Sequence, residues 1–225
     1  MDVLRINDTS ACSWYRRQQR AVHLVLGDSI ARDSGLASRL PGEDVLNLAK
    51  GGATWRSLSQ DLPSMLHQWS TRVHEGQQEY GTCLVWLTGN DIHSRLTELA
   101  SFDEQAAGSV LDIAQRVIAE LKLYTKSVML LGPLPRLSGE VVPIKWEQTA
   151  TFHFERRLKH VLDGSVQFVP LGRQLTRKQR NVRSLNSECA MWFRQDLVHL
   201  SPEGYGRVAD APELPIWVKM TAARL

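Results

Sequence analysis

Four short segments carry the residue types that nucleophilic catalysis requires, although they lie far apart in the chain. They are Gly27-Asp28-Ser29, Lys50-Gly51-Gly52-Ala53-Thr54, Thr88-Gly89-Asn90-Asp91 and Asp196-Leu197-Val198-His199. Together they supply a hydroxyl nucleophile, N–H groups that could stabilise an oxyanion, and an imidazole close to a carboxylate. This set of groups is typical of acyl-transfer chemistry, provided that the fold brings the segments together.

The first and last segments predict a nucleophile and its base. A serine hydroxyl is a weak nucleophile until a base takes its proton, and a histidine base needs a partner that fixes its tautomer. Asp196 precedes His199 by three positions, so one turn can place its carboxylate against the ring. We therefore expect Ser29 to be the nucleophile, His199 the base and Asp196 the orienting acid. The alternative for Ser29 is a simple helix cap.

The two middle segments predict the oxyanion hole. The backbone N–H groups of Ser29 and Gly52 and the side-chain amide of Asn90 are suitable donors, since glycine lets the backbone approach a substrate closely and an asparagine NH₂ carries no charge. Gly51 remains an alternative to Gly52. Asn90 and Asp91 could also form an ordinary turn.

Apolar runs and helical patterns alternate along the chain and predict the elements that position these residues. Five apolar runs predict strands at residues 22–26, 45–48, 83–87, 127–131 and 166–169. Helices are predicted from Ile30 to Leu40, after a cap at Thr54, after a Ser101–Glu104 capping box, from Trp146 to Leu162, and from Pro202. Residues 170–195 predict a long loop with a short helix.

This alternation indicates an α/β fold, a three-layer α/β/α sandwich with a five-stranded, mainly parallel sheet. We expect an N-terminal extension over residues 1–20 and a single domain over residues 21–225. Ser29, Gly52 and Asn90 each follow a predicted strand, and sites form beyond the carboxyl ends of parallel strands. All three should therefore meet at one edge of the sheet.

Net charge, cysteine content and the motifs that are missing limit the partners and the cellular location to expect. The chain has 225 residues and a net charge of +3, which is too small to indicate nucleic-acid binding by itself. Two basic clusters, Arg16-Arg17 with Arg20 and Arg173 to Arg183, are read as solvated surface, with phosphate or membrane contact as the alternative. The three cysteines favour a reducing compartment, and no signal peptide or membrane span is recognisable, so we expect a cytoplasmic protein. No metal or cofactor motif is evident, and none is expected.

The ordered segments resemble the blocks of the SGNH (or GDSL) hydrolase superfamily. Ser29 stands in a Gly-Asp-Ser-Ile block, Asn90 in a Gly-x-Asn-Asp block, and Asp196 and His199 in an Asp-x-x-His block. The glycine block, Gly-Gly-Ala-Thr, is a looser match. The resemblance implies a flavodoxin-like fold and a metal-free esterase, lipase or acetylesterase. The stretch from Leu131 to Arg136 also resembles one in esterase domains of the first-reading-frame proteins of some non-LTR retrotransposons.

We therefore expect a serine esterase that hydrolyses short-chain acyl esters, such as acetyl esters of small molecules, lipids or sugars, through an acyl-enzyme intermediate. Trp192 and Phe193 precede the Asp-x-x-His block and could form the wall of an acyl pocket, or equally belong to the core. The competing hypothesis is a non-catalytic module of the same fold that contacts nucleic acid, a membrane or a protein partner through its basic segments.

Overall fold

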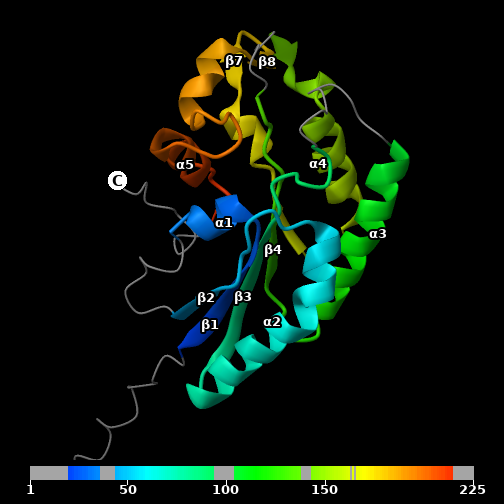
Figure 1. Cartoon of the computed structure of the whole chain (residues 1–225), viewed down its shortest axis with the longest axis vertical. Coiled ribbons are helices and arrows are strands. Elements are labelled where there is room, and N and C mark those ends of the chain that lie inside the picture. Colours follow the sequence, from blue (N-terminus) through cyan, green and yellow to red (C-terminus); the bar gives the residue numbers. More distant parts are fainter. Residues whose placement is uncertain are drawn as a thin grey trace, which may run out of the picture.

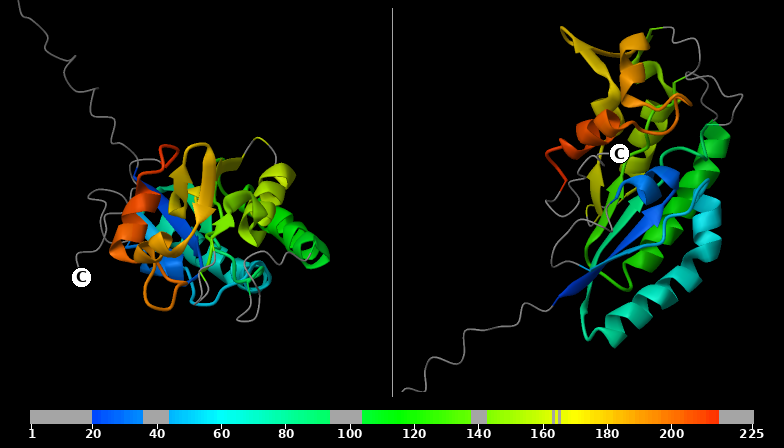
Figure 2. Two further views of the ribbon diagram at one scale, coloured as in Figure 1. Left: turned by 90° about the horizontal axis from the view of Figure 1, so that it is seen from above. Right: turned by 60° about the vertical axis from the view of Figure 1, so that its left-hand side comes forward.

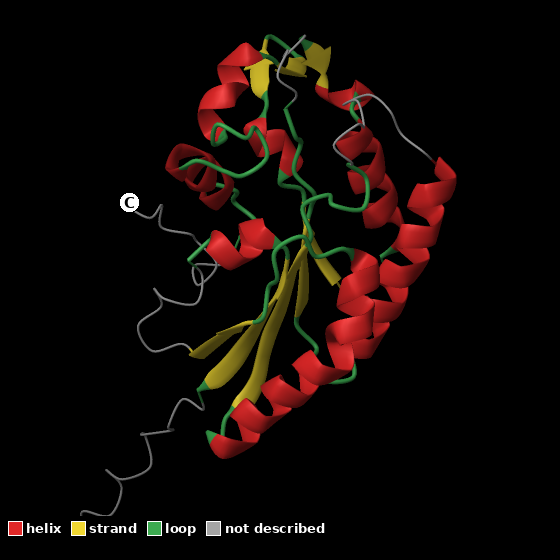
Figure 3. Cartoon of the chain, viewed as in Figure 1, coloured by secondary structure: helices red, strands yellow, loops and turns green. Residues whose placement is uncertain are grey.

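A computed structural model describes residues 20–35, 44–93, 104–137, 143–162, 164 and 166–214. The predicted extension over residues 1–20 therefore lies almost wholly outside the described residues, as does Ser101 of the predicted capping box. Figure 1 gives the element labels, and Figure 3 separates helices from strands by colour.

A five-stranded parallel sheet forms the centre of the molecule (Figure 1). Its strands are β1 (Ala21–Gly27), β2 (Asp44–Asn47), β3 (Glu79–Trp86), β4 (Val128–Leu131) and β6 (Val166–Val169). Their order is β2-β1-β3-β4-β6, and every pairing is parallel. This is the flavodoxin-like order, in which the chain changes direction across the sheet between β1 and β3. The prediction of a five-stranded parallel sheet is confirmed.

Helices cover both faces of the sheet, which confirms the three-layer architecture (Figures 1 and 3). One face carries the long helices α2 (Trp55–Glu75), α3 (Glu104–Leu121) and α4 (Ala150–Val161). The other carries the short helices α1 (Ser29–Asp33) and α5 (Pro202–Ala209) with the 3₁₀ turns η3 (Gly172–Leu175) and η4 (Ser187–Trp192). Within the described residues, no helix combines the length and apolarity that a membrane span needs.

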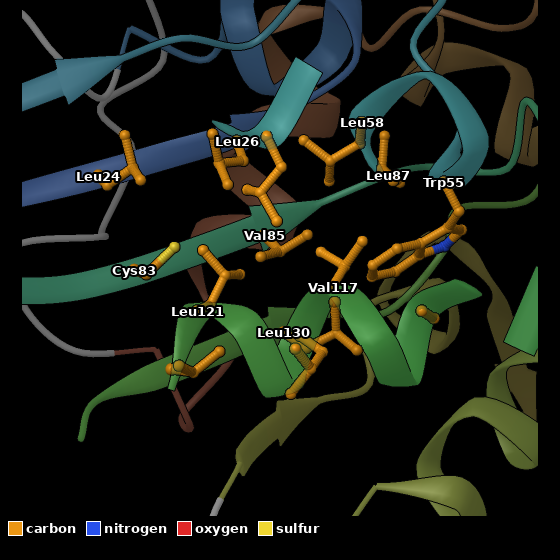
Figure 4. Close-up of a cluster of buried hydrophobic side chains, with 14 of the residues drawn as sticks. Leu24, Leu26, Trp55, Leu58, Cys83, Val85, Leu87, Val117, Leu121 and Leu130 are labelled. Atoms are coloured by element: carbon orange, nitrogen blue, oxygen red, sulfur yellow. The ribbon is translucent and has the colours of Figure 1, made fainter. Parts of the chain in front are cut away.

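Alternating side chains of the strands divide the core into two clusters. Leu24 and Leu26 of β1 join the cluster beneath α2 and α3, whereas Val25 joins the cluster on the opposite face. Figure 4 shows the first cluster, to which Val117 of α3 and Trp55 of α2 both belong. Each such side chain stabilises the fold by about 1.5–3 kcal/mol when it leaves water. This two-sided burial explains why the strands read as continuous apolar runs.

The helix predicted from Ile30 to Leu40 is shorter in the structure. Helix α1 ends at Asp33, because the backbone N–H and hydroxyl of Ser34 both turn back to the carbonyl of Ala31, and Gly35 follows with φ of 70°. Residues 36–43 lie outside the described part of the chain. The prediction of a continuous helix through residues 34 and 35 was wrong.

The helix predicted from Trp146 to Leu162 is interrupted near its start. Residues 146–148 form a 3₁₀ turn, η2 (Trp146–Gln148), and α4 begins only at Ala150. Thr149 separates them because its backbone is extended and its side chain caps the N–H of Phe152.

Residues 170–195 are more ordered than the long loop that the sequence predicted. Besides η3 and η4 they contain a hairpin of β7 (Arg177–Gln179) and β8 (Val182–Leu185), and β8 also pairs with β5 (Ile144–Lys145). The hairpin turns at Arg180, whose φ is 54°. Figure 2 shows this small antiparallel sheet beyond the end of the main one.

Candidate active site

Ser29 and His199 meet at the carboxyl end of β1, although 170 positions separate them. Ser29 is the first residue of α1 and remains partly exposed, while His199 lies in the loop between η4 and α5. Ser29 Oγ is 2.9 Å from His199 Nε2, and His199 Nδ1 is 2.6 Å from Asp196 Oδ2. The imidazole therefore donates from Nδ1 to the carboxylate, which leaves Nε2 free to accept the hydroxyl proton.

The Asp196 carboxylate is held as an anion by its own loop. Desolvation raises its pKa, but hydrogen bonds from the backbone N–H groups of His199 and Val198 and from the imidazole outweigh this and lower the pKa to about 2. The turn is tight, since Leu197 adopts a left-handed φ of 57°. Such a conformation costs a non-glycine residue energy that the surrounding contacts must offset. One of these contacts is the hydrogen bond from Leu137 N to Leu197 O, at 3.0 Å.

The turn that presents Ser29 is fixed by the buried carboxylate of Asp28. One oxygen caps α1 by accepting from Ile30 N at 3.0 Å, and the other accepts from both the N–H and the hydroxyl of Thr88. Gly27 is required just before it, because a Cβ there would lie 2.2 Å from the carbonyl oxygen of Trp86. From the sequence, Asp28 was assigned no role in the chemistry, although it lies in the first segment. Its bond to Thr88 had no local signal, because the partners are 60 positions apart.

The three predicted oxyanion donors belong to connected segments. Lys50 N donates to Gly27 O at 2.9 Å, which ties the glycine turn to the end of β1. Asn90 Nδ2 donates to Ala53 O at 2.8 Å, which ties the third segment to the same turn. Gly52 adopts a φ of 73°, a conformation that favours glycine.

Each of the three predicted donors also has an N–H hydrogen that could bind an oxyanion. In the part of the chain that the structure describes, the N–H groups of Ser29 and Gly52 donate to no acceptor. Asn90 commits one of its two N–H bonds to Ala53 and keeps the other. Asp91 accepts from Trp55 N at 3.1 Å and thus fixes the start of α2, which agrees with a structural role for this carboxylate.

Trp192 and Phe193 are placed in the core rather than at an open surface. Their exposed fractions are only 4% and 5%, and both belong to the apolar cluster on the α5 face. The guanidinium groups of Arg177 and Arg207 both lie over the Trp192 ring, at 5.0 and 4.9 Å from its centre. A packing role accounts for this placement, and the substrate-binding role stays a prediction without support from the geometry.

One side chain beside Asn90 was not expected. Arg136, in the segment after β4, donates through Nη2 to Asn90 Oδ1 and through Nη1 to the carbonyl of His93. The resemblance noted for the stretch from Leu131 to Arg136 marked this segment, but it gave the arginine no role, and no spacing pattern in the sequence reveals its partner. Among the described residues, no group of three or more His, Cys, Asp or Glu side chains is arranged to hold a metal ion.

Solved structures of hydrolases share this fold. An acetylxylan esterase from Geobacillus stearothermophilus aligns over 86% of this chain and 93% of its own, with a TM-score of 0.54 and 18% identity. A lipase/acylhydrolase from Enterococcus faecalis aligns over 82% and 89%, with a TM-score of 0.51 and 15% identity. An α/β hydrolase from the metagenome of Lake Arreo, Spain, aligns over 85% and 92%, with a TM-score of 0.54 and 14% identity. No family model and no curated protein matches the sequence.

The chain therefore has the same fold as these esterases and acylhydrolases. At these identities the likeness concerns the fold alone, so the activity has to be argued from the residues of this chain.

Proposed function

We propose that this protein is a serine esterase that cleaves short-chain acyl esters through an acyl-enzyme intermediate. The observation that carries the proposal is the continuous line of hydrogen bonds from Ser29 Oγ through His199 to Asp196. The esterase and acylhydrolase names of the structural neighbours agree with it. A purely structural protein would have no need for this line at the carboxyl edge of the sheet.

In the first half of the reaction, Ser29 Oγ attacks the ester carbonyl carbon while His199 Nε2 takes the hydroxyl proton. The resulting oxyanion accepts hydrogen bonds from the N–H groups of Ser29 and Gly52 and from the spare N–H of Asn90. When the tetrahedral intermediate collapses, the C–O bond to the alcohol breaks and the imidazolium returns the proton to the leaving oxygen. Asp196 stabilises the imidazolium throughout.

In the second half, water attacks the acyl carbon and gives its proton to His199. Collapse of the second intermediate breaks the bond to Ser29 Oγ, which regains a proton from the imidazolium, and the carboxylic acid leaves. Each missing oxyanion donor is expected to slow these steps by about 10²–10³-fold.

The proposed acyl group is small, with acetyl as the first choice. Substitution of Ser29→Ala should lower kcat for a chromogenic acetyl ester by at least about 10⁴-fold, because no nucleophile remains. The thermal midpoint should be nearly unchanged, since the hydroxyl is partly exposed. Ser109→Ala is the matched control, because this exposed hydroxyl on α3 bonds only to the carbonyl of Gln105 in the described structure.

A chain-length panel from acetyl to octanoyl esters then tests the acyl size, and turnover should fall as the chain lengthens. Undiminished turnover by the Ser29→Ala variant would overturn the proposed nucleophile.

A further inference from the structure

Asn90 carries a side-chain amide whose two ends differ chemically but hardly in shape. Only the NH₂ end can stabilise an oxyanion, while the oxygen end would repel it. An amide that rotates by half a turn about its last bond therefore loses its function without any change in packing. Neighbouring hydrogen-bond partners must therefore fix which end of the amide faces the substrate.

The Asn90 amide has a hydrogen-bond partner at each end, and these two partners fix its orientation. Nδ2 donates to Ala53 O at 2.8 Å, and Oδ1 accepts from Nη2 of Arg136. In the reversed orientation the amide NH₂ would face a guanidinium, which has only donors, and the oxygen would face a carbonyl, which has only acceptors. Both contacts would then become repulsive.

Arg136 is itself held firmly by the backbone on each side. Leu134 N donates to Thr88 O at 3.1 Å, and Leu137 N donates to Leu197 O at 3.0 Å. Thr88 lies two residues before Asn90, and Leu197 lies in the turn between Asp196 and His199. The short segment around Arg136 is thus fixed both to the asparagine segment and to the histidine turn.

Partial burial of the Arg136 guanidinium costs free energy, because the charged group loses contact with water. Burial lowers the pKa of the guanidinium, and the charge of the buried Asp28 carboxylate opposes this effect. Burial, together with the charge of the same guanidinium, lowers the pKa of His93 to about 4, so this neighbour stays neutral. The guanidinium therefore places a half-buried positive charge beside the amide, which polarises Asn90 and strengthens its N–H as a donor.

We propose that Arg136 is a positioning residue for the esterase, which fixes the orientation of the Asn90 amide so that its free N–H faces the oxyanion. The inference rests on the proposed function for its catalytic consequence. It makes a separate structural claim, that the Asn90 amide is locked by Arg136, which holds whether or not an ester is the substrate.

The kinetic test combines Arg136→Ala with Asn90→Ala in a double-mutant cycle on the acetyl ester. Arg136→Ala should lower kcat by about 10- to 100-fold with KM changed by less than about twofold, because an interaction made mainly in the transition state is lost. In the Asn90→Ala background the same substitution should cost less than about threefold, since the residue through which Arg136 acts is absent. Arg136→Lys, which keeps the charge but not the planar donor pair, should recover part of the loss.

Arg183→Ala is the matched control for removing a partly buried arginine. Arg183 lies on β8 and donates to Arg173 O and to Thr176 Oγ1, at 3.1 and 3.2 Å. The kcat of the Arg183→Ala variant should equal that of the wild type. If Arg136→Ala does not fold, as judged by circular dichroism, Arg136→Gln and Arg136→Lys carry the same comparison.

The structural test is the NMR signal of the Asn90 side-chain NH₂, assigned by its loss in Asn90→Ala. Its two protons should exchange slowly with water in the wild type and faster in Arg136→Ala. An active wild type with fully additive losses in the cycle overturns the positioning role and leaves the esterase proposal intact. An inactive wild type overturns the esterase proposal. In that case the inference about Arg136 is tested by the Asn90 NH₂ signal alone, and an unchanged exchange rate in Arg136→Ala overturns it.

Discussion

The catalytic edge of the sheet and the basic hairpin region both concentrate polar side chains, but they are organised in opposite ways. The basic hairpin region comprises β7, β8 and the Trp192 ring with the guanidinium groups of Arg177 and Arg207 over it. At the catalytic edge the partners come from distant segments, 170 positions apart for Ser29 and His199 and 46 apart for Arg136 and Asn90. In the basic hairpin region Arg183 bonds to partners only 7 and 10 positions away.

This difference indicates what each region depends on. The catalytic edge exists only when the whole sheet is assembled, so its geometry reports the complete fold. Apart from the pairing of β8 with β5, the basic hairpin region depends more on local contacts, and we expect its charges to be replaceable without disturbing the main sheet. A catalytic role is therefore expected for the first region, and the second is free to vary or to serve another purpose.

The largest effect is expected from Asp196→Asn at the catalytic edge. Loss of the carboxylate removes the group that fixes the His199 tautomer and stabilises the imidazolium, so kcat should fall by about 100-fold or more. Because the pKa of Asp196 is about 2, the acid stays ionised in the wild type, and its own titration should not appear in a pH–rate profile between about pH 4 and 9. Asp210→Asn, an exposed carboxylate at the end of α5, should leave kcat unchanged.

A smaller and different effect is expected from Trp192→Leu in the basic hairpin region. This substitution shrinks a buried ring and removes the surface on which Arg177 and Arg207 stack, so the free energy of unfolding should fall by about 2–4 kcal/mol in urea denaturation. The ratio of acetyl to butyryl turnover should not change. Trp192→Phe, which keeps an aromatic ring, should lose less stability.

An altered acyl preference in Trp192→Leu, without loss of stability, would contradict the packing role and restore the pocket wall that the sequence allowed.

The smallest effect is expected from the double substitution Lys178→Gln with Arg180→Asn on the hairpin. Both side chains are exposed, and asparagine tolerates the left-handed φ of 54° at residue 180. The free energy of unfolding should change by less than about 0.5 kcal/mol, and kcat should stay the same. A drop in kcat would show that the hairpin belongs to the site. Salt-sensitive retention of the wild type on a polyanion column, lost in the variant, would instead favour the binding-module hypothesis.

The sequence was most informative where a chemical pattern coincided with a simple structural one. Ser29, Gly52 and Asn90 each follow an apolar strand, and strand ends are placed by sheet topology, so their meeting could be predicted. Asp196 and His199 were predictable because three positions are enough for one turn to join them. These assignments depended on local patterns combined with a single rule about parallel sheets.

The parts that could not be predicted depend on contacts between distant segments or on weak patterns. Arg136 has no local partner that would mark it, and its contact with Asn90 forms only when β4 lies beside β3. The hairpin was missed because β7 reads Arg177-Lys178-Gln179, without the alternating apolar residues of a strand, and its Arg180-Asn181 turn lacks glycine. Helix α1 was extended too far because the stop signal of Gly35, a glycine just past the helix end, was overlooked.

The central claim is that Ser29 is a nucleophile activated by His199, and reaction with a fluorophosphonate probe tests it most directly. Such a probe bonds covalently to an activated serine oxygen, and the labelled peptide is then identified by mass spectrometry. We predict one adduct, on Ser29, that is absent from Ser29→Ala and strongly reduced in a variant that lacks the imidazole of His199. A folded wild-type protein that is not labelled, or that is labelled at another residue, would contradict the account.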